Sequence, residues 1–95
     1  MAHVVARGLQ LRLYVAGNAP NSVSALSNLK AICAEHFALG YEIEVVDLLK
    51  EPGRAMTDGV IVTPTLIKLS PSPKTRLIGS LSDTARVLQA LSSST

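Results

Sequence analysis

Four segments of the chain carry apolar patterns that are typical of β-strands. Residues 9–16 alternate apolar and polar positions, and residues 41–48 begin with the same alternation, so each predicts a strand with one buried face. Residues 60–69 form the densest run of β-branched and aliphatic residues, which predicts a buried central strand. Pro64 cannot donate to a sheet ladder, so it marks the entrance of this strand. After a proline-containing reversal, residues 75–79 predict an antiparallel partner.

A long helix is expected between the first two strands. Asn21 or Ser22 can cap its start, Gly40 can stop it, and it should run to about Leu39. Its apolar residues recur at spacings of three and four, which predicts one buried stripe. The stripe consists of Val23, Leu26, Leu29, Ile32, Cys33 and Phe37.

Two shorter helices complete the pattern. Residues 55–59 are long enough only for a short helix that ends at Gly59. Ser82 or Asp83 can cap a final helix that runs through Leu91. The residues of this helix that are available for packing are Ala85, Val87, Leu88 and Leu91.

The elements read β-α-β-α-β-β-α, which is the order of a thioredoxin-like domain. The first two strands should be parallel, because the crossover of a βαβ unit is right-handed and returns the chain in the same direction. We therefore predict an α/β fold with a mixed four-stranded sheet, as one domain over residues 1–95 with an ordered core at about 9–91. Thioredoxin-like domains place a cis proline where this chain has Thr63-Pro64.

Composition narrows the classes of function. The net charge is +2, the nine lysines and arginines are scattered, and Tyr14, Phe37 and Tyr41 are the only aromatic residues, which argues against nucleic-acid binding. Apolar runs are too short for a membrane span, and no secretory leader is visible. With a single cysteine there is no internal disulfide, so we expect a cytoplasmic protein.

Catalytic machinery is not evident in the sequence. A redox thiol would lie at the start of the first helix, but residues 17–22 contain no cysteine, and Cys33 falls in the apolar stripe as a structural thiol. The two histidines stand apart, so we expect no metal and no cofactor. Glu42, Glu44 and Asp47 are interpreted as residues on the solvent-exposed face of an edge strand rather than as acid-base groups.

Specific motifs resemble the KaiB family. They are the run from Leu13 to Ser22, the step Thr63-Pro64-Thr65-Leu66, the Pro71-Ser72-Pro73 turn and the run from Leu77 to Ser82. The resemblance covers residues 9–91 and implies a non-enzymatic regulatory protein that binds the ring of a KaiC-like ATPase and modulates its phosphorylation and ATPase cycle. It also implies two possible folds, a ground-state tetramer and a thioredoxin-like binding form.

Departures from the cyanobacterial pattern modify these expectations. Ala90 and Ser92 replace a glycine and an aspartate, and because alanine favours a helix over glycine, we expect the thioredoxin-like form rather than the ground-state fold. Glu44 replaces a lysine on the strand that pairs with KaiA in relatives, which argues against a KaiA partner. Ser24 and Gly59 replace cations of the docking surface, so the partner is expected to be a divergent KaiC-like ATPase.

The resemblance and the predicted fold together assign a partner-binding surface. Its residues are Asn18, Pro20, Asn21, Ser24, Asp58, Gly59, Thr63 and Pro64, with Glu42 and Glu44 on the edge strand. The alternative is that these are only turn and capping residues. Two other functions remain open, a thioredoxin-like redox protein and a stand-alone KaiB-like sensor module that signals to a histidine kinase. The protein is expected to be a monomer or a small homo-oligomer.

Overall fold

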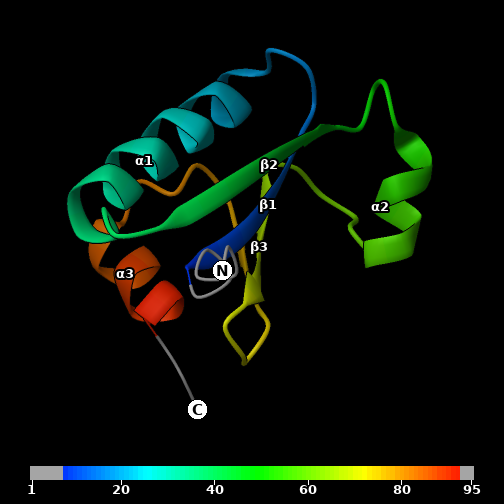
Figure 1. The fold of residues 1–95 in the computed structure, drawn as a ribbon. Coiled ribbons are helices and arrows are strands. Elements are labelled where there is room, and N and C mark those ends of the chain that lie inside the picture. The colour runs from blue at the N-terminus through cyan, green and yellow to red at the C-terminus, as the bar shows by residue number, and fades with distance from the viewer. Residues whose placement is uncertain (1–7, 93–95) are drawn as a thin grey trace.

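The computed structural model describes residues 8–92 and has the predicted element order (Figure 1). The sheet has four strands in the order β2-β1-β3-β4; β1 and β2 are parallel, and the other neighbouring strands are antiparallel. The strands are β1 (Leu9–Val15), β2 (Tyr41–Asp47), β3 (Thr65–Ser70) and β4 (Thr75–Ile78). The helices are α1 (Pro20–His36), α2 (Pro52–Asp58) and α3 (Thr84–Ser92). The thioredoxin-like arrangement is thereby confirmed.

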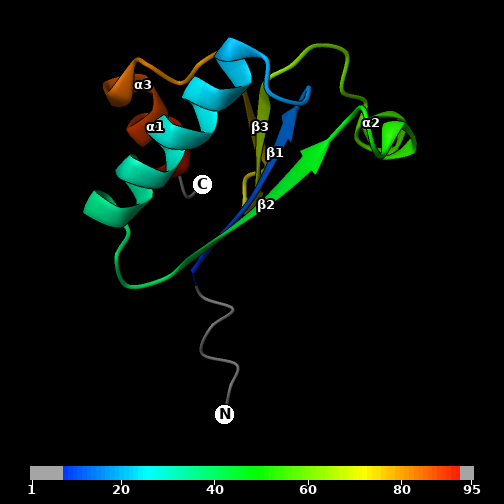
Figure 2. The ribbon, with the colours of Figure 1, turned by 90° about the horizontal axis from the view of Figure 1, so that it is seen from above.

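Helices cover both faces of the sheet. α1 and α3 pack on one face, and α2 lies on the other, as the view from above shows (Figure 2). Successive side chains of β1 point to opposite faces, because the side-chain period of a strand is two. Leu11 and Leu13 therefore join the core under α1 and α3, whereas Tyr14 joins the smaller core under α2.

The larger core holds most of the buried apolar side chains. Leu13, Leu29 and Cys33 are completely buried in it, which confirms the prediction of a buried thiol. The smaller core under α2 consists of Tyr14, Val46, Ala55 and Ile67. α2 thus contributes one buried apolar residue, so polar contacts must supply much of what holds it to the sheet.

The central strand is shorter than the apolar run predicts. The run begins at Val60, but β3 begins at Thr65, and Ile61 is 93% exposed. Pro64 has no N–H to give to a ladder, so pairing starts only after it. The peptide bond between Thr63 and Pro64 is cis. The residues before Pro64 therefore form a loop rather than part of a buried strand: Ile61 and Val62 are exposed, and Val60 packs against the smaller core.

α1 begins and ends earlier than predicted. Pro20 is the first helical residue and Ala19 is the N-cap, with no side-chain hydrogen bond to the helix. Ser22 is not a cap, because its Oγ instead accepts a hydrogen bond from the Ala16 N–H at 3.2 Å. The helix ends at His36, before Gly40. Val23 is 54% exposed, so the buried stripe is shifted to Ser22, Ala25, Leu29, Ile32 and Cys33.

The other two helices agree better with prediction. α2 starts at Pro52 rather than at residue 55, and it ends before Gly59, whose φ of 65° is the left-handed conformation that a glycine adopts easily. Asp83 caps α3 by accepting a hydrogen bond from the Arg86 N–H at 3.2 Å. Ala85 is exposed and does not pack as expected. Within residues 8–92, no helix has both the length and the apolar character required to cross a bilayer.

The uncapped start of α1 gives a prediction about stability. Replacing Ala19 by Ser supplies a hydroxyl that can accept a hydrogen bond from a first-turn N–H, so Ala19→Ser should raise the free energy of unfolding by about 1 kcal/mol. Asp83→Ala removes the cap of α3 and should lower it by about 1 kcal/mol. Urea unfolding followed by circular dichroism measures both changes. If both substitutions changed the free energy of unfolding by the same amount and in the same direction, these assignments of the two helix caps would be contradicted.

Candidate functional site

Several connections meet at one end of the sheet. The register pairs Val15 with Asp47, Tyr14 with Thr65, and Thr65 with Ile78, so β1, β2 and β4 finish where β3 begins. We call this region the loop end and define it as residues 16–22, 48–51 and 60–64 together with Gly79. Backbone N–H and C=O groups in loops are not paired within the sheet, so such a region is suited to contact a partner.

Asp47 holds two of these loops together. Its Oδ1 accepts hydrogen bonds from the Gly17 N–H at 3.0 Å and from the Leu49 N–H at 2.9 Å. These bonds stabilise the carboxylate and lower the pKa of Asp47 below its usual value. Gly17 has a φ of 54°, so it occupies a conformation that a side chain would disfavour. Asp47 therefore fixes the geometry of these loops. The sequence predicts only that it lies on a solvent-exposed face of the strand, which does not suggest this role.

The turn before β3 is fixed in a similar way. Pro64 is buried, and its carbonyl accepts a hydrogen bond from the Gly79 N–H at 3.0 Å. Thr65 Oγ1 donates to the Val62 carbonyl at 2.6 Å. The loop is anchored at its end, while Ile61 and Val62 project from it with exposed side chains.

Exposed aliphatic residues accompany the polar loops. Ile61 and Val62 lie in the loop before β3, Leu49 is 73% exposed after β2, and Val23 is exposed in the first turn of α1. An ideal Cβ placed on Gly17 would lie 3.0 Å from Leu49 Cδ1, so Leu49 sits directly beside the first loop. Sequence reasoning missed these residues because it assigned Ile61 and Val62 to a buried strand. The available signal was Pro64, which separates them from β3.

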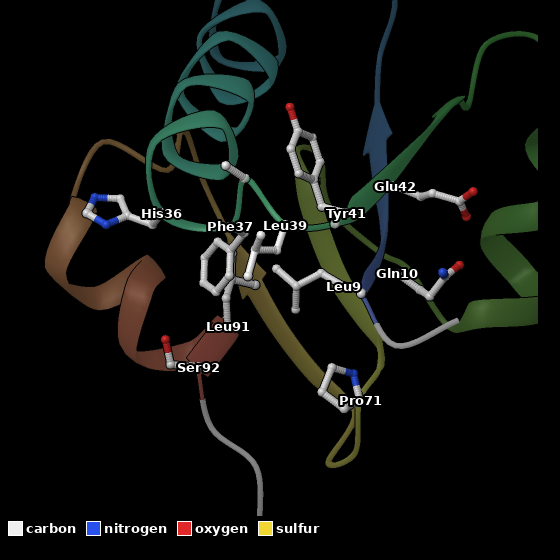
Figure 3. A pocket seen from close by; sticks show the side chains of 13 residues that line it. Leu9, Gln10, His36, Phe37, Leu39, Tyr41, Glu42, Pro71, Leu91 and Ser92 are labelled. Atoms are coloured by element: carbon white, nitrogen blue, oxygen red, sulfur yellow. The ribbon is translucent and has the colours of Figure 1, made fainter. Parts of the chain in front are cut away.

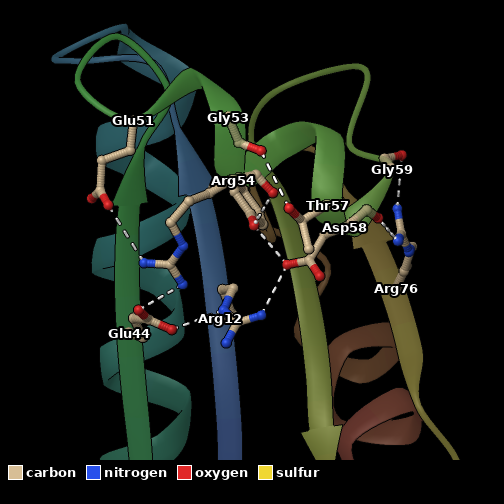
Figure 4. Close-up of polar contacts among 10 residues, drawn as sticks. Arg12, Glu44, Glu51, Gly53, Arg54, Thr57, Asp58, Gly59 and Arg76 are labelled. Carbon is tan, nitrogen blue, oxygen red and sulfur yellow. Dashed lines mark hydrogen bonds and ion pairs between the residues drawn. The ribbon is translucent and has the colours of Figure 1, made fainter.

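The structure brings together only part of the predicted surface. Asn18, Pro20 and Asn21 follow β1, and Thr63 and Pro64 precede β3, so these five lie at the loop end. Ser24 is exposed one turn further along α1. Asp58 and Gly59 lie at the end of α2, over the opposite face of the sheet (Figure 4). The Asp58 side chain is turned toward β1, where it contacts Arg12 and Tyr14.

Asp58 is the centre of the polar contacts that hold α2 to the sheet. Its Oδ2 lies 2.6 Å from the Tyr14 hydroxyl and 2.9 Å from Arg12 Nη1. The hydroxyl of Tyr14 is also 2.8 Å from the carbonyl oxygen of Arg54, and with one hydrogen it donates to one acceptor at a time. The hydrogen bond from Tyr14 and the charge of Arg12 lower the pKa of Asp58.

Glu44 extends this network to the edge strand. Its Oε1 lies 2.8 Å from Arg12 Nε, and its Oε2 lies 2.8 Å from Arg54 Nη2 (Figure 4). Both arginines lower the pKa of Glu44. Glu42 is exposed two residues earlier on the same strand. The two glutamates of β2 therefore differ: Glu44 joins β2 to β1 and α2, and Glu42 faces solvent.

The thiol of Cys33 has an environment unlike that of a redox centre. It is completely buried within α1, away from the helix start, and burial raises its pKa to about 11. A thiol with such a pKa is almost entirely protonated near pH 7, and the thiolate is the nucleophile. Among residues 8–92, no group of three His, Cys, Asp or Glu side chains is arranged to hold a metal ion.

The sequence matches one protein family over most of its length. Residues 12–93 match the family described as the KaiB domain. The chain is 51% identical over 81 residues to the "Circadian clock oscillator protein KaiB" of Microcystis aeruginosa, which covers 85% of this chain and 78% of that protein. The protein of the same name from Nostoc punctiforme gives the same identity and coverage.

Solved structures support the fold. The N-terminal domain of SasA from Synechococcus elongatus superimposes with a TM-score of 0.76 at 26% identity, covering 96% of this chain and 90% of that one. The thioredoxin Deadhead of Drosophila melanogaster gives a TM-score of 0.72 at 14% identity, covering 90% of this chain and 80% of that one. At that level of identity the thioredoxin shows the fold alone.

The Asp58 contacts predict a pH-dependent stability. Asp58→Asn removes a charged acceptor, so we expect it to lower the free energy of unfolding by about 1–3 kcal/mol at pH 7. The pKa of Asp58 is lower in the folded protein than its ordinary value of 3.8. Its carboxylate therefore stabilises the folded state above about pH 4, and this contribution disappears as the pH falls through the lowered folded pKa.

Urea titrations of wild type and Asp58→Asn at pH 7 and pH 3 test this. The free-energy difference between them should shrink at pH 3. Glu42→Gln, an exposed substitution on β2, is the matched control and should change little at either pH. A difference for Asp58→Asn that is the same at both pH values would contradict the assignment.

Proposed function

The chain belongs to the KaiB family, and on that premise we propose that it is a non-enzymatic clock-type regulator that docks on the ring of a KaiC-like ATPase through its loop end. The curated relatives carry the name of a clock oscillator protein, which places this chain in a family of clock components. Docking on an ATPase ring is what the family resemblance implies for this chain.

The exposed aliphatic side chains of the loop end carry the proposal. Ile61 is 93% exposed although isoleucine is among the residues most often buried. Burying one such side chain at an interface contributes about 1.5–3 kcal/mol. Ile61, Val62 and Leu49 border the polar loops, so the surface combines apolar anchors with backbone donors and acceptors, as protein interfaces do.

The loops also have the rigidity that docking requires. Asp47 joins the loops after β1 and β2, and the hydrogen bond from Gly79 to Pro64 fixes the turn before β3. A surface that is already ordered loses less conformational entropy on binding. We therefore take the thioredoxin-like form to be the binding form. Ala90, which packs against the core from α3, supports that helix and hence this form.

A sensor module is the second candidate function. The SasA N-terminal domain has a similar fold at 26% identity, which supports a stand-alone KaiB-like sensor that signals to a histidine kinase. The 51% identity to KaiB proteins favours the regulator. Such a sensor would detect the phosphorylated KaiC-like ring without controlling it, so ring binding alone does not separate the two functions. A regulator changes the phosphorylation or ATPase cycle of the ring, whereas a sensor leaves that cycle unchanged and contacts a kinase.

The structure changes the argument about a KaiA-type partner. Glu44 disfavours such a partner only if its negative charge is free to repel the partner's surface. Arg12 and Arg54 both pair with Glu44 and offset its charge, and Arg54 comes from α2. The charge of this residue alone is therefore no reason to exclude a KaiA-type partner.

Light scattering coupled to size-exclusion chromatography tests docking. We expect a ring-sized complex when the protein is mixed with a KaiC-type hexamer in the presence of ATP or ADP. Ile61→Ser should weaken the complex about tenfold or more, since it removes most of one apolar anchor. Leu39→Ser is the matched control, because Leu39 is equally exposed but lies at the other end of the sheet. Equal affinities of the two variants would contradict docking through the loop end.

A thiol assay tests the redox alternative. Because Cys33 is buried with a raised pKa, neither wild type nor Cys33→Ala should accelerate insulin reduction by dithiothreitol. Activity in wild type that Cys33→Ala abolishes would overturn the non-enzymatic assignment. Circular dichroism of the variant verifies that it is folded.

A further inference from the structure

β4 leaves one edge of the sheet open. The strand order is β2-β1-β3-β4, so β4 is hydrogen-bonded to a neighbouring strand on one side only. It consists of Thr75–Ile78, and the antiparallel register places Ile78 opposite Thr65 of β3. An unpaired strand edge is a template on which a further strand can form hydrogen bonds.

The hydrogen-bond pattern shows which backbone groups face this open edge. In an antiparallel pair, opposite residues alternate between bonded pairs, which exchange hydrogen bonds, and non-bonded pairs, whose N–H and C=O groups point outward. The Gly79 N–H donates to the Pro64 carbonyl at 3.0 Å, so these two residues are a bonded pair. Ile78 and, two residues earlier, Arg76 therefore belong to non-bonded pairs. Their backbone groups point away from β3 and form no hydrogen bond within residues 8–92.

A small pocket opens beside this edge. It has a volume of about 190 Å³ and lies between β4 and the start of α3. The buried side chains of Leu77, Leu81 and Val87 line it, as does the exposed side chain of Ile78. A cavity of about 150 Å³ is enough to hold benzene, whereas small-molecule sites occupy roughly 300–1,000 Å³. The pocket therefore suits one apolar side chain rather than a whole small molecule.

The connection from β4 to α3 has an unusual conformation where it borders the pocket. Leu81 has a φ of 63°, and among residues 8–92 it is the only residue other than glycine with a positive φ. Asn28 of α1 donates a hydrogen bond from Nδ2 to the Ser80 carbonyl at 2.9 Å, which fixes the same connection. Such conformations persist where surrounding contacts hold the chain, and they are found at ligand clamps. The wall of the pocket is thus ordered before a partner binds.

The charged side chains around this edge are mostly cations. Residues 74–86 contain Lys74, Arg76 and Arg86 against one carboxylate, Asp83. The Arg76 guanidinium is bound to backbone carbonyls at the end of α2. Lys74 and Arg86 are exposed, and neither forms an ion pair in the part of the chain that the structure describes. Complementary charge on a partner is therefore negative.

We propose that β4 pairs with an extended acidic segment of a partner protein, which adds a fifth strand to the sheet. Main-chain hydrogen bonds to Arg76 and Ile78 supply affinity, and the pocket beside Leu81 takes one apolar side chain, as in other cases of strand addition. Side chains of a strand alternate between its two faces, so the acidic residues of the segment lie on the face of Lys74 and Arg76. This surface needs no ATPase ring, and the proposal does not depend on docking through the loop end.

Amide hydrogen exchange tests the open edge in the protein alone. Followed by NMR on the full ¹⁵N-labelled chain, the Arg76 and Ile78 amides should exchange at least about tenfold faster than the Leu77 amide, which is bonded to β3. An acidic strand peptide should slow the exchange of the two outward amides. Equal protection of all three amides in the free protein would contradict the assignment of the edge.

Three blocked seven-residue peptides test the chemistry of the occupant. The first alternates valine with glutamate, and the second has lysine in place of each glutamate. The third is the glutamate peptide with every amide N-methylated, which removes its main-chain donors. The glutamate peptide should bind at least about tenfold more tightly than the lysine peptide, with amide shifts at residues 75–87. The N-methylated peptide should not bind.

Substitutions separate the backbone and charge contributions. Ile78→Pro removes an outward N–H and leaves the bonds to β3, so it should weaken binding about tenfold, whereas Ile78→Val keeps this donor and should change little. Lys74→Gln should reduce the preference for glutamate over lysine. Leu39→Ser is a distant control and should have no effect. Leu39 is completely exposed and lines a groove of about 950 Å³ at the end of the sheet opposite the loop end (Figure 3).

Several results would overturn the proposal. They are equal affinity for the glutamate and lysine peptides, binding of the N-methylated peptide, and amide shifts that map to the loop end or to the groove instead of β4. A dimer of the protein alone, seen by light scattering and abolished by Ile78→Pro, would assign the edge to a second copy and would also overturn it. If Ile78→Pro does not fold, as its amide spectrum reports, the N-methylated peptide provides the same test.

Discussion

β1 is the strand on which the rest of the structure depends. It is hydrogen-bonded to β2 on one side and to β3 on the other, and its side chains enter both cores. Leu11 and Leu13 hold α1 and α3, while Tyr14 reaches α2. Because a strand alternates its side chains, one short segment fixes the position of all three helices.

α2 is held by a different kind of interaction. Its one buried apolar residue, Ala55, gives little hydrophobic stabilisation, whereas Asp58 and Arg54 both contact polar residues of the sheet. Hydrogen bonds to charged groups are stronger than neutral ones, and they require defined geometry. The helix is therefore placed by Arg12, Tyr14 and Glu44, and the charge of the edge strand depends on the same contacts.

The two ends of the sheet have different surfaces. The loop end combines ordered polar backbone with exposed aliphatic residues such as Ile61, which suits a protein partner. The opposite end has a groove that opens onto the core between Phe37 and Leu91.

The sequence by itself determined the element order, the parallel β1 and β2, the end of α2 at Gly59, and the family, because periodicity, turn chemistry and motifs are local properties. It left Ser82 and Asp83 as alternative caps of α3, and the structure selects Asp83. It placed Asn18 and Pro64 in loops that meet at one end of the sheet. Only the tertiary structure decided that Ile61 is exposed, that Asp58 accepts a hydrogen bond from Tyr14, and that Arg12 and Arg54 pair with Glu44. These outcomes depend on contacts between residues far apart in the chain, and a local pattern carries no information about such distances.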